Sequence, residues 1–400
     1  MATETIELSG HIVDSLLLAK VLDVIVDAGV AYELVDVDVG RTNVDPSRAR
    51  IELEGTQDQL DRLIDDLNVH GVNRLAAGIT QLVTADVDGV LPVGFYSTTN
   101  LATDVLVDGR WIPVENPEMD CGIVVAQGRA RTLPMHRVRV GDQIVVGSGG
   151  VRVQAPAKHR GATAFEFMSS EVSSEKPKGL VIAQVADRIR AARERGGKVL
   201  AVCGPAVVHT GGAPDVARLV DAGWIDVLFA GNGFASHDIE SNVLGTSLGV
   251  SITKGTPTEG GHSNHLRVIN EVRRHGSIAA AVDAGYITGG VMATCVRRAV
   301  PFVLGGSIRD DGPLPDVYTD TTAAADAMRA EIPGVVVALM LATTLHAIAV
   351  GNCLPAGVET FCVDINQAVV TKLADRGSHQ ALGIVTDVGP FVGQLADALC

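Results

Sequence analysis

Two segments of the sequence place glycine and small polar residues directly after a short apolar run. Each run is typical of a buried parallel strand, and ligands bind in the crevice at the carboxyl ends of such strands. Glycine at that position lets the backbone come close to a phosphate or a ribose. The pattern therefore favours a nucleotide over a metal or a nucleic acid. The candidate cofactor-binding residues of the two segments are Thr210, Gly211, Gly212, Asn232 and Gly233.

Residues 116–121 are the candidates for binding and activating a substrate. Glu118 and Asp120 stand at i and i+2, so both carboxylates would lie on the same side of an extended segment. One could hold an ammonium group while the other acts as a base. The alternative is a polar turn after Pro117, and both interpretations stay open. The predicted catalytic residues of this segment are Asn116, Glu118 and Asp120.

The residues His237, Asp238 and Glu240 are predicted to begin the helix that follows the second strand. The two carboxylates would suit the positive end of the helix dipole as plain caps. His237 could instead be a proton shuttle at the crevice, and we assign His237 and Asp238 to the catalytic group. A further pair, His262 and His265, has a spacing that two metal ligands can use. No cysteine or carboxylate cluster accompanies this pair in the sequence, so we expect a loop over the cofactor and no metal site.

Composition argues against several classes of function. The chain has 400 residues and a net charge of −15 without basic clusters, whereas a nucleic-acid groove or an anionic-lipid site needs a positive face. Six cysteines without a CxxC pair indicate free thiols in a reducing cytoplasm. The most apolar stretch, residues 335–350, is too short to span a membrane, so we expect a buried helix there.

The elements that position these residues fall into three predicted domains. Residues 1–83 follow the order β-α-β-β-α-β, which predicts a ferredoxin-like α+β module. Residues 84–177 contain short valine-rich strands divided by glycine, aspartate and proline, which indicate a β-rich subdomain and a linker. Residues 178–400 alternate strands and helices, which predicts a doubly wound, mostly parallel α/β sheet.

The usual glycine fingerprint for dinucleotides is absent from the α/β region of the sequence. A similar run, residues 147–150, lies in the β-rich section and no predicted helix follows it. A dinucleotide that binds this chain must be held in another way.

Several long motifs resemble those of one known family. They are residues 9–15 (SGHIVDS), 39–46 (VGRTNVDP), 116–121 (NPEMDC), 202–212 (VCGPAVVHTGG), 231–240 (GNGFASHDIE), 363–366 (VDIN) and 386–389 (TDVG). The chain resembles the archaeal-type ornithine cyclodeaminases over nearly its whole length. Their front half is the lysine-oxoglutarate reductase/saccharopine dehydrogenase conserved region, and their back half is similar to the NAD-binding fold of deoxyhypusine synthase. The chain departs from the family at Gly233 and Ser236, where alanine and valine are common.

The resemblance implies an enzyme that converts L-ornithine into L-proline and ammonia with tightly bound NAD. In that reaction NAD takes a hydride from Cα, the δ-amine attacks the resulting imine, ammonia leaves, and the hydride returns to the cyclic imine. An amino-acid substrate, a homo-oligomer and a cytoplasmic location are expected with it. The alternatives are another NAD-dependent amino-acid deaminase or imine reductase, and a non-catalytic sensor of NAD or amino acids.

The resemblance also implies cofactor contacts at the ends of later strands. For Asp364 and Asp387, which each close an apolar strand, the alternative is a helix N-cap. For His346, the alternative is a buried histidine inside an apolar helix. The implied contacts are Asp311, Thr343, Thr344, Leu345, His346, Asp364, Ile365, Asp387 and Val388.

Overall fold

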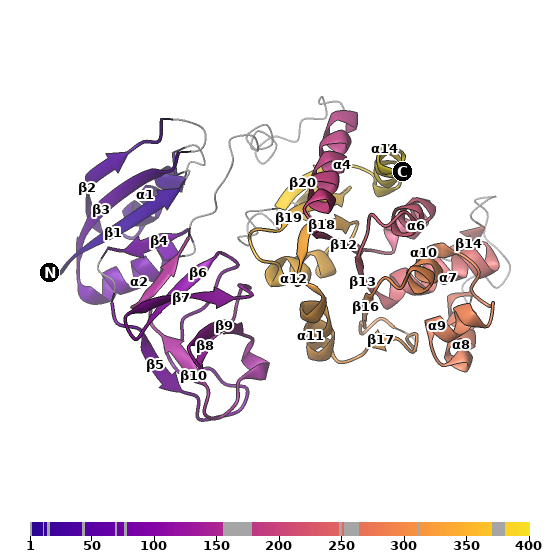
Figure 1. Ribbon diagram of the computed structural model, residues 1–400, viewed down its shortest axis with the longest axis horizontal. Coiled ribbons are helices and arrows are strands. Elements are labelled where there is room, and N and C mark those ends of the chain that lie inside the picture. The colour runs from indigo at the N-terminus through magenta and orange to yellow at the C-terminus, as the bar shows by residue number, and fades with distance from the viewer. Residues whose placement is uncertain are drawn as a thin grey trace. The chain divides into compact units, whose positions relative to one another are not determined.

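The chain divides into two compact units (Figure 1). The first comprises Met1–Ser170 with Asn352–Gly357, and the second comprises Glu171–Gly351 and Val358–Cys400. The computed structural model describes residues 2–10, 12–13, 17–41, 45–68, 70–75, 78–154, 178–247, 250–251, 264–310, 312–369 and 381–400.

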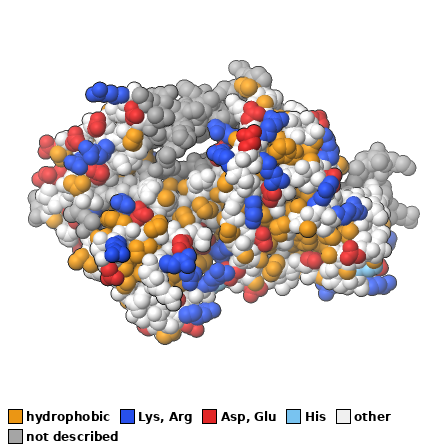
Figure 2. All heavy atoms as spheres, in the orientation of Figure 1, with side chains coloured by type: hydrophobic (Ala, Val, Ile, Leu, Met, Phe, Trp, Pro, Cys, Tyr) orange, Lys and Arg blue, Asp and Glu red, His pale blue; other side chains and the backbone are white. Residues whose placement is uncertain are grey.

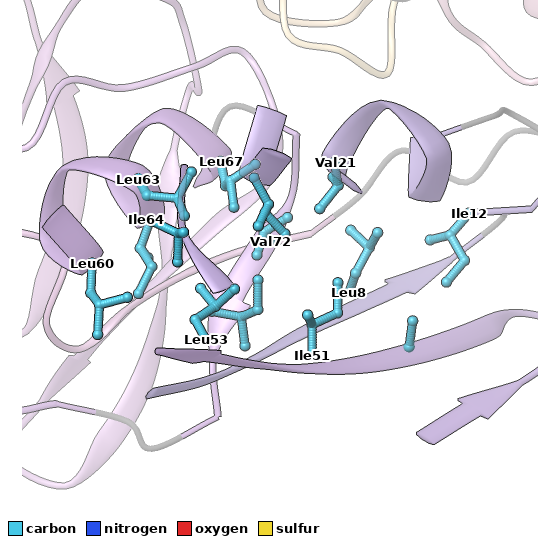
Figure 3. Close-up of a cluster of buried hydrophobic side chains, with 14 residues drawn as sticks. Leu8, Ile12, Val21, Ile51, Leu53, Leu60, Leu63, Ile64, Leu67 and Val72 are labelled. Atoms are coloured by element: carbon cyan, nitrogen blue, oxygen red, sulfur yellow. The ribbon is translucent and has the colours of Figure 1, made fainter. Parts of the chain in front are cut away.

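A four-stranded antiparallel sheet and two helices form the N-terminal part of the first unit. The strand order β2-β3-β1-β4 is the ferredoxin-like order that the sequence predicts. Alternate residues of β3, such as Ile51 and Leu53, enter a core that Leu60 and Ile64 of α2 complete (Figure 3). The elements are β1 (Ala2–Gly10), α1 (Leu17–Asp27), β2 (Ala31–Asp38), β3 (Ser47–Gly55), α2 (Gln57–Asn68) and β4 (Val72–Arg74).

Seven short strands form the second sheet of this unit, in the order β11-β6-β7-β9-β8-β10-β5. Neighbouring strands are antiparallel except β7 and β9, which run parallel. The predicted β-rich region is therefore confirmed, while its boundaries stay a prediction. The elements are β5 (Gln81–Thr84), β6 (Thr103–Val107), β7 (Arg110–Glu115), β8 (Gly122–Ala126), β9 (Arg129–Leu133), the 3₁₀ helix Met135–Arg137, β10 (Gln143–Val146) and β11 (Val151–Val153).

A parallel sheet of seven strands organises the second unit and confirms the predicted doubly wound class. The strand order is β17-β16-β13-β12-β18-β19-β20, so the chain winds outward from β12 in one direction and from β18 in the other. The carboxyl ends of β12 and β18 therefore form the switch point at which such sheets bind ligands.

The strands of this sheet are β12 (Lys198–Cys203), β13 (Val227–Gly231), β16 (Phe302–Gly305), β17 (Val317–Tyr318), β18 (Val335–Leu341), β19 (Glu359–Asp364) and β20 (Ala381–Val385). A separate hairpin consists of β14 (Thr246–Ser247) and β15 (Val250–Ser251). The helices are α4 (Lys178–Glu194), α5 (Ala206–His209), α6 (Ala213–Asp221), α7 (Asn232–Leu244), α8 (Asn264–His275), α9 (Ile278–Asp283), α10 (Gly290–Arg298), α11 (Thr321–Glu331), α12 (Leu345–Cys353) and α14 (Val388–Leu399).

The prediction of a helix over residues 335–349 is wrong. Residues 335–341 form β18, which pairs with β12 on one side and β19 on the other. A central strand covered on both faces is apolar at nearly every position, so its sequence lacks the alternation that distinguishes a strand from a buried helix. Helix α12 begins only at Leu345.

Several other elements differ from the prediction or lie outside the described residues. Helix α7 begins at Asn232, five residues before the predicted start at His237. Helices α10 and α14 were not predicted. Most of the predicted helix 367–376 and the predicted linker 156–177 lie outside the described residues.

Acidic and basic side chains are interspersed over the visible face of each unit (Figure 2). Within the described residues, no helix combines the length and the apolarity needed to cross a membrane.

The backbone leaves no room for a side chain at Gly204, directly after β12. A Cβ atom there would lie 1.9 Å from the backbone oxygen of Ala342. We expect Gly204→Ala to lower the free energy of unfolding by about 3 kcal/mol or more, because a backbone atom cannot move aside as a side chain can. Urea unfolding followed by circular dichroism measures this. The control is Gly179→Ala in α4, where a Cβ meets nothing within 4 Å; equal stability of the two variants would contradict the prediction.

Candidate functional site

The loops that follow β12 and β20 lie against each other at the carboxyl edge of the parallel sheet. A Cβ atom on Gly389, in the first turn of α14, would lie 2.5 Å from Thr210 O. Likewise, a Cβ on Gly212 would lie 3.3 Å from the Cα of Gly389. The structure therefore brings the Thr210–Gly212 turn together with Asp387 and Val388, although β12 and β20 are not adjacent strands.

Asp387 is the N-cap of α14, since its Oδ1 accepts a hydrogen bond from Gly389 N at 3.0 Å. Asp364 lies at the end of β19 and is buried, and its Oδ1 accepts from Asn366 N at 2.8 Å. The side chain of Asp387 remains exposed. Asp387 is thus an N-cap. A carboxylate has a second oxygen that can accept hydrogen bonds, so the ribose interpretation of Asp387 and Asp364 stays a prediction.

His346 bridges the ends of two neighbouring strands. Its ring lies close to two glycines: a Cβ on Gly231 would be 2.9 Å from a ring atom, and a Cβ on Gly305 would be 3.3 Å from one. These two glycines are register partners in β13 and β16. Burial lowers the pKa of His346, which favours the neutral imidazole. His346 therefore lies in the first turn of α12 at the sheet edge rather than inside an apolar helix.

The remaining predicted cofactor residues surround the same edge. Asn232 is buried, and its Oδ1 accepts from Leu314 N at 3.0 Å, so its amide fixes the loop after β16. A Cβ on Gly204 would lie 3.0 Å from the Cβ of Thr343, which places Thr343 at the switch point. Gly211, Gly233 and Thr344 lie in the loops or first turns that follow β12, β13 and β18. Asp311 lies outside the described residues.

Two apolar side chains at this edge face solvent. Leu345 is 81% exposed and Ile365 is 76% exposed, and they follow β18 and β19, respectively. Exposed apolar side chains beside glycine turns and carboxylates suit the flat rings of a dinucleotide, whose phosphates and riboses take the polar groups.

His237 lies in the second turn of α7 and faces two other groups. Its Nδ1 is 2.9 Å from Glu240 Oε2 on the same helix. Its ring centroid is 4.9 Å from that of His209, the last residue of α5. The same face of α7 lies near α5 one turn earlier, where a Cβ on Gly233 would be 3.3 Å from Cγ of Pro205, the N-cap of α5.

Asp238 is fully buried and does not cap its own helix, which was the alternative to a catalytic role. Its two oxygens accept hydrogen bonds from Val291 N at 3.0 Å and Met292 N at 2.9 Å, in the first turn of α10. The carboxylate therefore caps a different helix, where the N–H groups and the dipole favour negative charge. Asp238 thus ties α7 to α10, and its catalytic role stays a prediction.

The substrate-side candidates lie in the first unit, and their expected geometry is wrong. Asn116 and Asp120 have φ angles of 50° and 63°, so the segment is not extended and the i, i+2 rule does not apply. Glu118 is buried, whereas Asn116 and Asp120 are exposed. Thr98 Oγ1 donates to Glu118 O at 2.6 Å, and Thr132 Oγ1 donates to Asn116 O at 2.6 Å. Their catalytic role stays a prediction.

The first unit also contains a cavity of about 670 Å³ that holds no predicted site residue. Its charged lining consists of Glu4, Asp61 and Arg74, and the Arg74 guanidinium pairs with both carboxylates. The single positive charge of Arg74 balances one of the two carboxylates, so the charged lining carries a net charge of −1. In the described part of the chain, no three His, Cys, Asp or Glu side chains are arranged to hold a metal ion, and His262 lies outside that part.

Family models match three consecutive regions of the chain. They are the conserved region of the LOR/SDH bifunctional enzyme (residues 3–101), the first region of the C-terminal part of ArgZ-like arginine dihydrolases (102–182), and the Rossmann fold of that C-terminal part (183–395). An ornithine cyclodeaminase from Methanopyrus kandleri is 48% identical over 400 residues, which cover 99% of this chain and 97% of that protein. The chain belongs to the ornithine cyclodeaminase family.

Solved structures of the family agree with this assignment. A conserved LOR/SDH protein from Methanococcus maripaludis is 47% identical with a TM-score of 0.76, and the match covers 80% of this chain and 98% of that one. AgrE, named from Nostoc as a bifunctional arginine dihydrolase/ornithine cyclodeaminase, was solved in a ternary complex with ornithine and NAD+. It is 41% identical with a TM-score of 0.55, and the match covers 100% of this chain and 57% of AgrE.

These matches confirm the predicted family, the prediction of an enzyme, and NAD as the cofactor of the family. They do not test the individual site residues, which stay predictions. Sequence reasoning missed His209 and the role of Glu240. The spacing from His237 to Glu240 is i to i+3, which places two side chains on one helix face, so the sequence held a signal for this pair once the start of α7 was known.

Asp238 makes the stability of this ornithine cyclodeaminase family member depend on pH. Burial raises its pKa to about 6, against the opposing effect of the hydrogen bonds from Met292 and Val291. A carboxyl group with a raised folded-state pKa stabilises the fold below its unfolded pKa and loses that contribution as pH rises through the folded value. We expect a loss of about 3 kcal/mol between pH 4 and pH 7.

The measurement is urea unfolding of the natural protein and of Asp238→Asn at several pH values. The amide does not titrate, so the stability of the natural protein relative to the variant should fall as pH rises from 4 to 7. A difference that stays constant over this range would show that burial does not raise this pKa.

Proposed function

We propose that this chain is an NAD-dependent ornithine cyclodeaminase that converts L-ornithine into L-proline and ammonia without net oxidation. The observation that carries the proposal is the convergence of predicted contact residues on the carboxyl edge of one parallel sheet, in a chain 48% identical to an ornithine cyclodeaminase over almost its whole length. AgrE, a relative of similar architecture, binds ornithine and NAD+ together.

The residues at this edge fit a dinucleotide. The Thr210–Gly212 turn and the first turn of α7 offer backbone that approaches a phosphate closely. Asp387 and Asp364 are placed to accept hydrogen bonds from ribose hydroxyls, while Leu345 and Ile365 offer apolar surface for the rings. Bound NAD would supply the acceptor and donor of the hydride that leaves and returns to the substrate.

The finer assignments follow from the same proposal. Asn116, Glu118 and Asp120 are proposed to bind the substrate, and His237 and Asp238 are proposed to support proton transfer. A role in ornithine catabolism and proline formation follows from the proposed reaction. Free cysteines, among them the buried Cys203, Cys295 and Cys362, are consistent with the proposed cytoplasmic location. Assembly as a homo-oligomer also stays a proposal.

The first experiment is incubation of the purified protein with L-ornithine and NAD+. We expect proline and ammonia in equal amounts, with no accumulation of NADH, because the hydride returns to the product. Net NADH formation on an amino acid would favour a deaminase instead. Tight retention of NAD without turnover of any amino acid would favour a sensor.

A conservative variant of Asp387 separates cofactor binding from helix capping. Asparagine caps helices as well as aspartate does, but it offers one acceptor oxygen in place of two and carries no charge. We expect Asp387→Asn to keep its stability and to bind NAD+ about 10- to 100-fold more weakly, which calorimetry measures. Asp397→Asn removes the same charge near the other end of α14 and should not change NAD+ affinity. Unchanged affinity in Asp387→Asn would leave this residue as a cap alone.

A further inference from the structure

Three imidazoles form a row that begins at the cofactor edge of the second unit. The ring of His237 is 4.9 Å from that of His209 and 6.0 Å from that of His265. The three residues come from α5, α7 and α8, which are separate elements of the fold. His209 directly precedes Thr210 and is exposed, so the row opens beside the turn proposed to bind the cofactor.

A buried carboxylate holds the middle ring of this row. Glu240 is 0% exposed, and its Oε2 lies 2.9 Å from Nδ1 of His237. A carboxylate only accepts, so Nδ1 carries a hydrogen that it donates to Glu240. The other ring nitrogen, Nε2, is then the one at which a proton can be gained or lost.

Glu240 is itself fixed by a chain of hydrogen bonds to α8. Thr246 Oγ1 donates to its second oxygen, Oε1, at 2.8 Å. Asn264 Nδ2, at the first residue of α8, donates to Thr246 Oγ1 at 2.9 Å. A base oriented by a buried carboxylate, which is oriented in turn by further hydrogen bonds, is the arrangement found where an imidazole moves protons in catalysis.

The charged neighbours of His209 act on it in opposite directions. Partial burial of the ring lowers the pKa of His209, the neighbouring imidazole of His237 lowers it further, and the carboxylate of Glu240 raises it. Glu240 therefore favours the protonated form of His209, which the other two effects disfavour. Asp238, the next residue after His237, bonds to α10.

We propose that His209 is the catalytic acid–base group of the ornithine reaction, and that His237 and Glu240 are positioning residues that tune it. This proposal rests on the function proposed above. His209 takes a proton from the δ-ammonium of the substrate, so that the free δ-amine can form its bond to the imine carbon Cα. The δ-nitrogen of the resulting aminal carries a positive charge and loses a second proton to solvent. His209 returns its own proton to the α-nitrogen as the bond between Cα and the α-nitrogen breaks, ammonia leaves and the cyclic imine forms. His209 takes one proton and returns one, so it ends in its starting state.

The test compares His209→Gln, Glu240→Gln and the control His275→Gln in the full-length protein. His275 is the last residue of α8, and its ring stacks on Tyr286, with centroids 5.7 Å apart. We expect kcat for proline formation to fall by about 10²- to 10⁴-fold in His209→Gln, the usual contribution of a general acid–base group. His275→Gln should stay within about threefold of the natural protein. All three variants should bind NAD+ with nearly unchanged affinity, because none of the three residues is proposed to contact it.

Glu240→Gln distinguishes positioning from simple structural support. Loss of the carboxylate makes protonation of His209 harder, so the acid limb of the pH profile of kcat/KM should move to lower pH by about one unit. A purely structural role would change the melting temperature and would leave the pH profile in place. His209→Gln remains informative even if Glu240→Gln does not fold, since the exposed His209 is not part of the core.

Histidine NMR titration of the protein without substrate reports on His209 independently of turnover. We expect the apparent pKa of His209 to be lower in Glu240→Gln than in the natural protein, because the carboxylate of Glu240 raises it. If the natural protein does not turn over ornithine, the proposed function fails while this titration still tests the effect of Glu240 on His209. Near-normal kcat in His209→Gln, or an identical His209 titration with and without the Glu240 carboxylate, would overturn the proposal.

Discussion

The close approach of two backbones at the switch point is the constraint on which the rest of the site depends. Strands β12 and β18 are neighbours in the sheet. After β12 the next strands are added on one side of this pair, and after β18 they are added on the other side. Gly204 and Ala342, the residues directly after these strands, approach so closely that only a glycine fits at position 204. A larger residue would separate the two strands and, with them, the loops that carry Thr210 and Thr343.

Small residues recur around this edge for the same reason. Gly231 and Gly305 leave space for the ring of His346, and Gly389 leaves space for the backbone of Thr210. Because glycine has no side chain, another element can lie directly against the backbone at each of these strand ends. Backbone and glycine therefore build this edge, and the dinucleotide site proposed there would not need the usual fingerprint at the first turn.

Helix α7 combines two buried carboxylates with different tasks. Asp238 satisfies the open N–H groups of α10, and Glu240 satisfies the ring of His237 and the hydroxyl of Thr246. A buried charge is tolerated only where hydrogen bonds compensate for lost water, and both residues meet that condition. These contacts fix α7 against α8 and α10, so the position of His237 is set by elements that follow it in the chain.

The sequence by itself determined the classes of sheet and the segments that end at the site. The sequence predicts the ferredoxin-like order, and it predicts the alternation of strands and helices after residue 178. Both predictions are possible because apolar residues recur every 2 positions in a half-buried strand and every 3.6 positions in a half-buried helix. The motifs likewise identified the family. The sequence could not identify β18, whose residues are buried on both faces and so leave no period. Nor could the sequence predict the hydrogen bonds of Asp238, because its partners Val291 and Met292 lie more than fifty residues away along the chain. Only tertiary structure decides such contacts, because they depend on which helices meet and not on the spacing of residues along one helix.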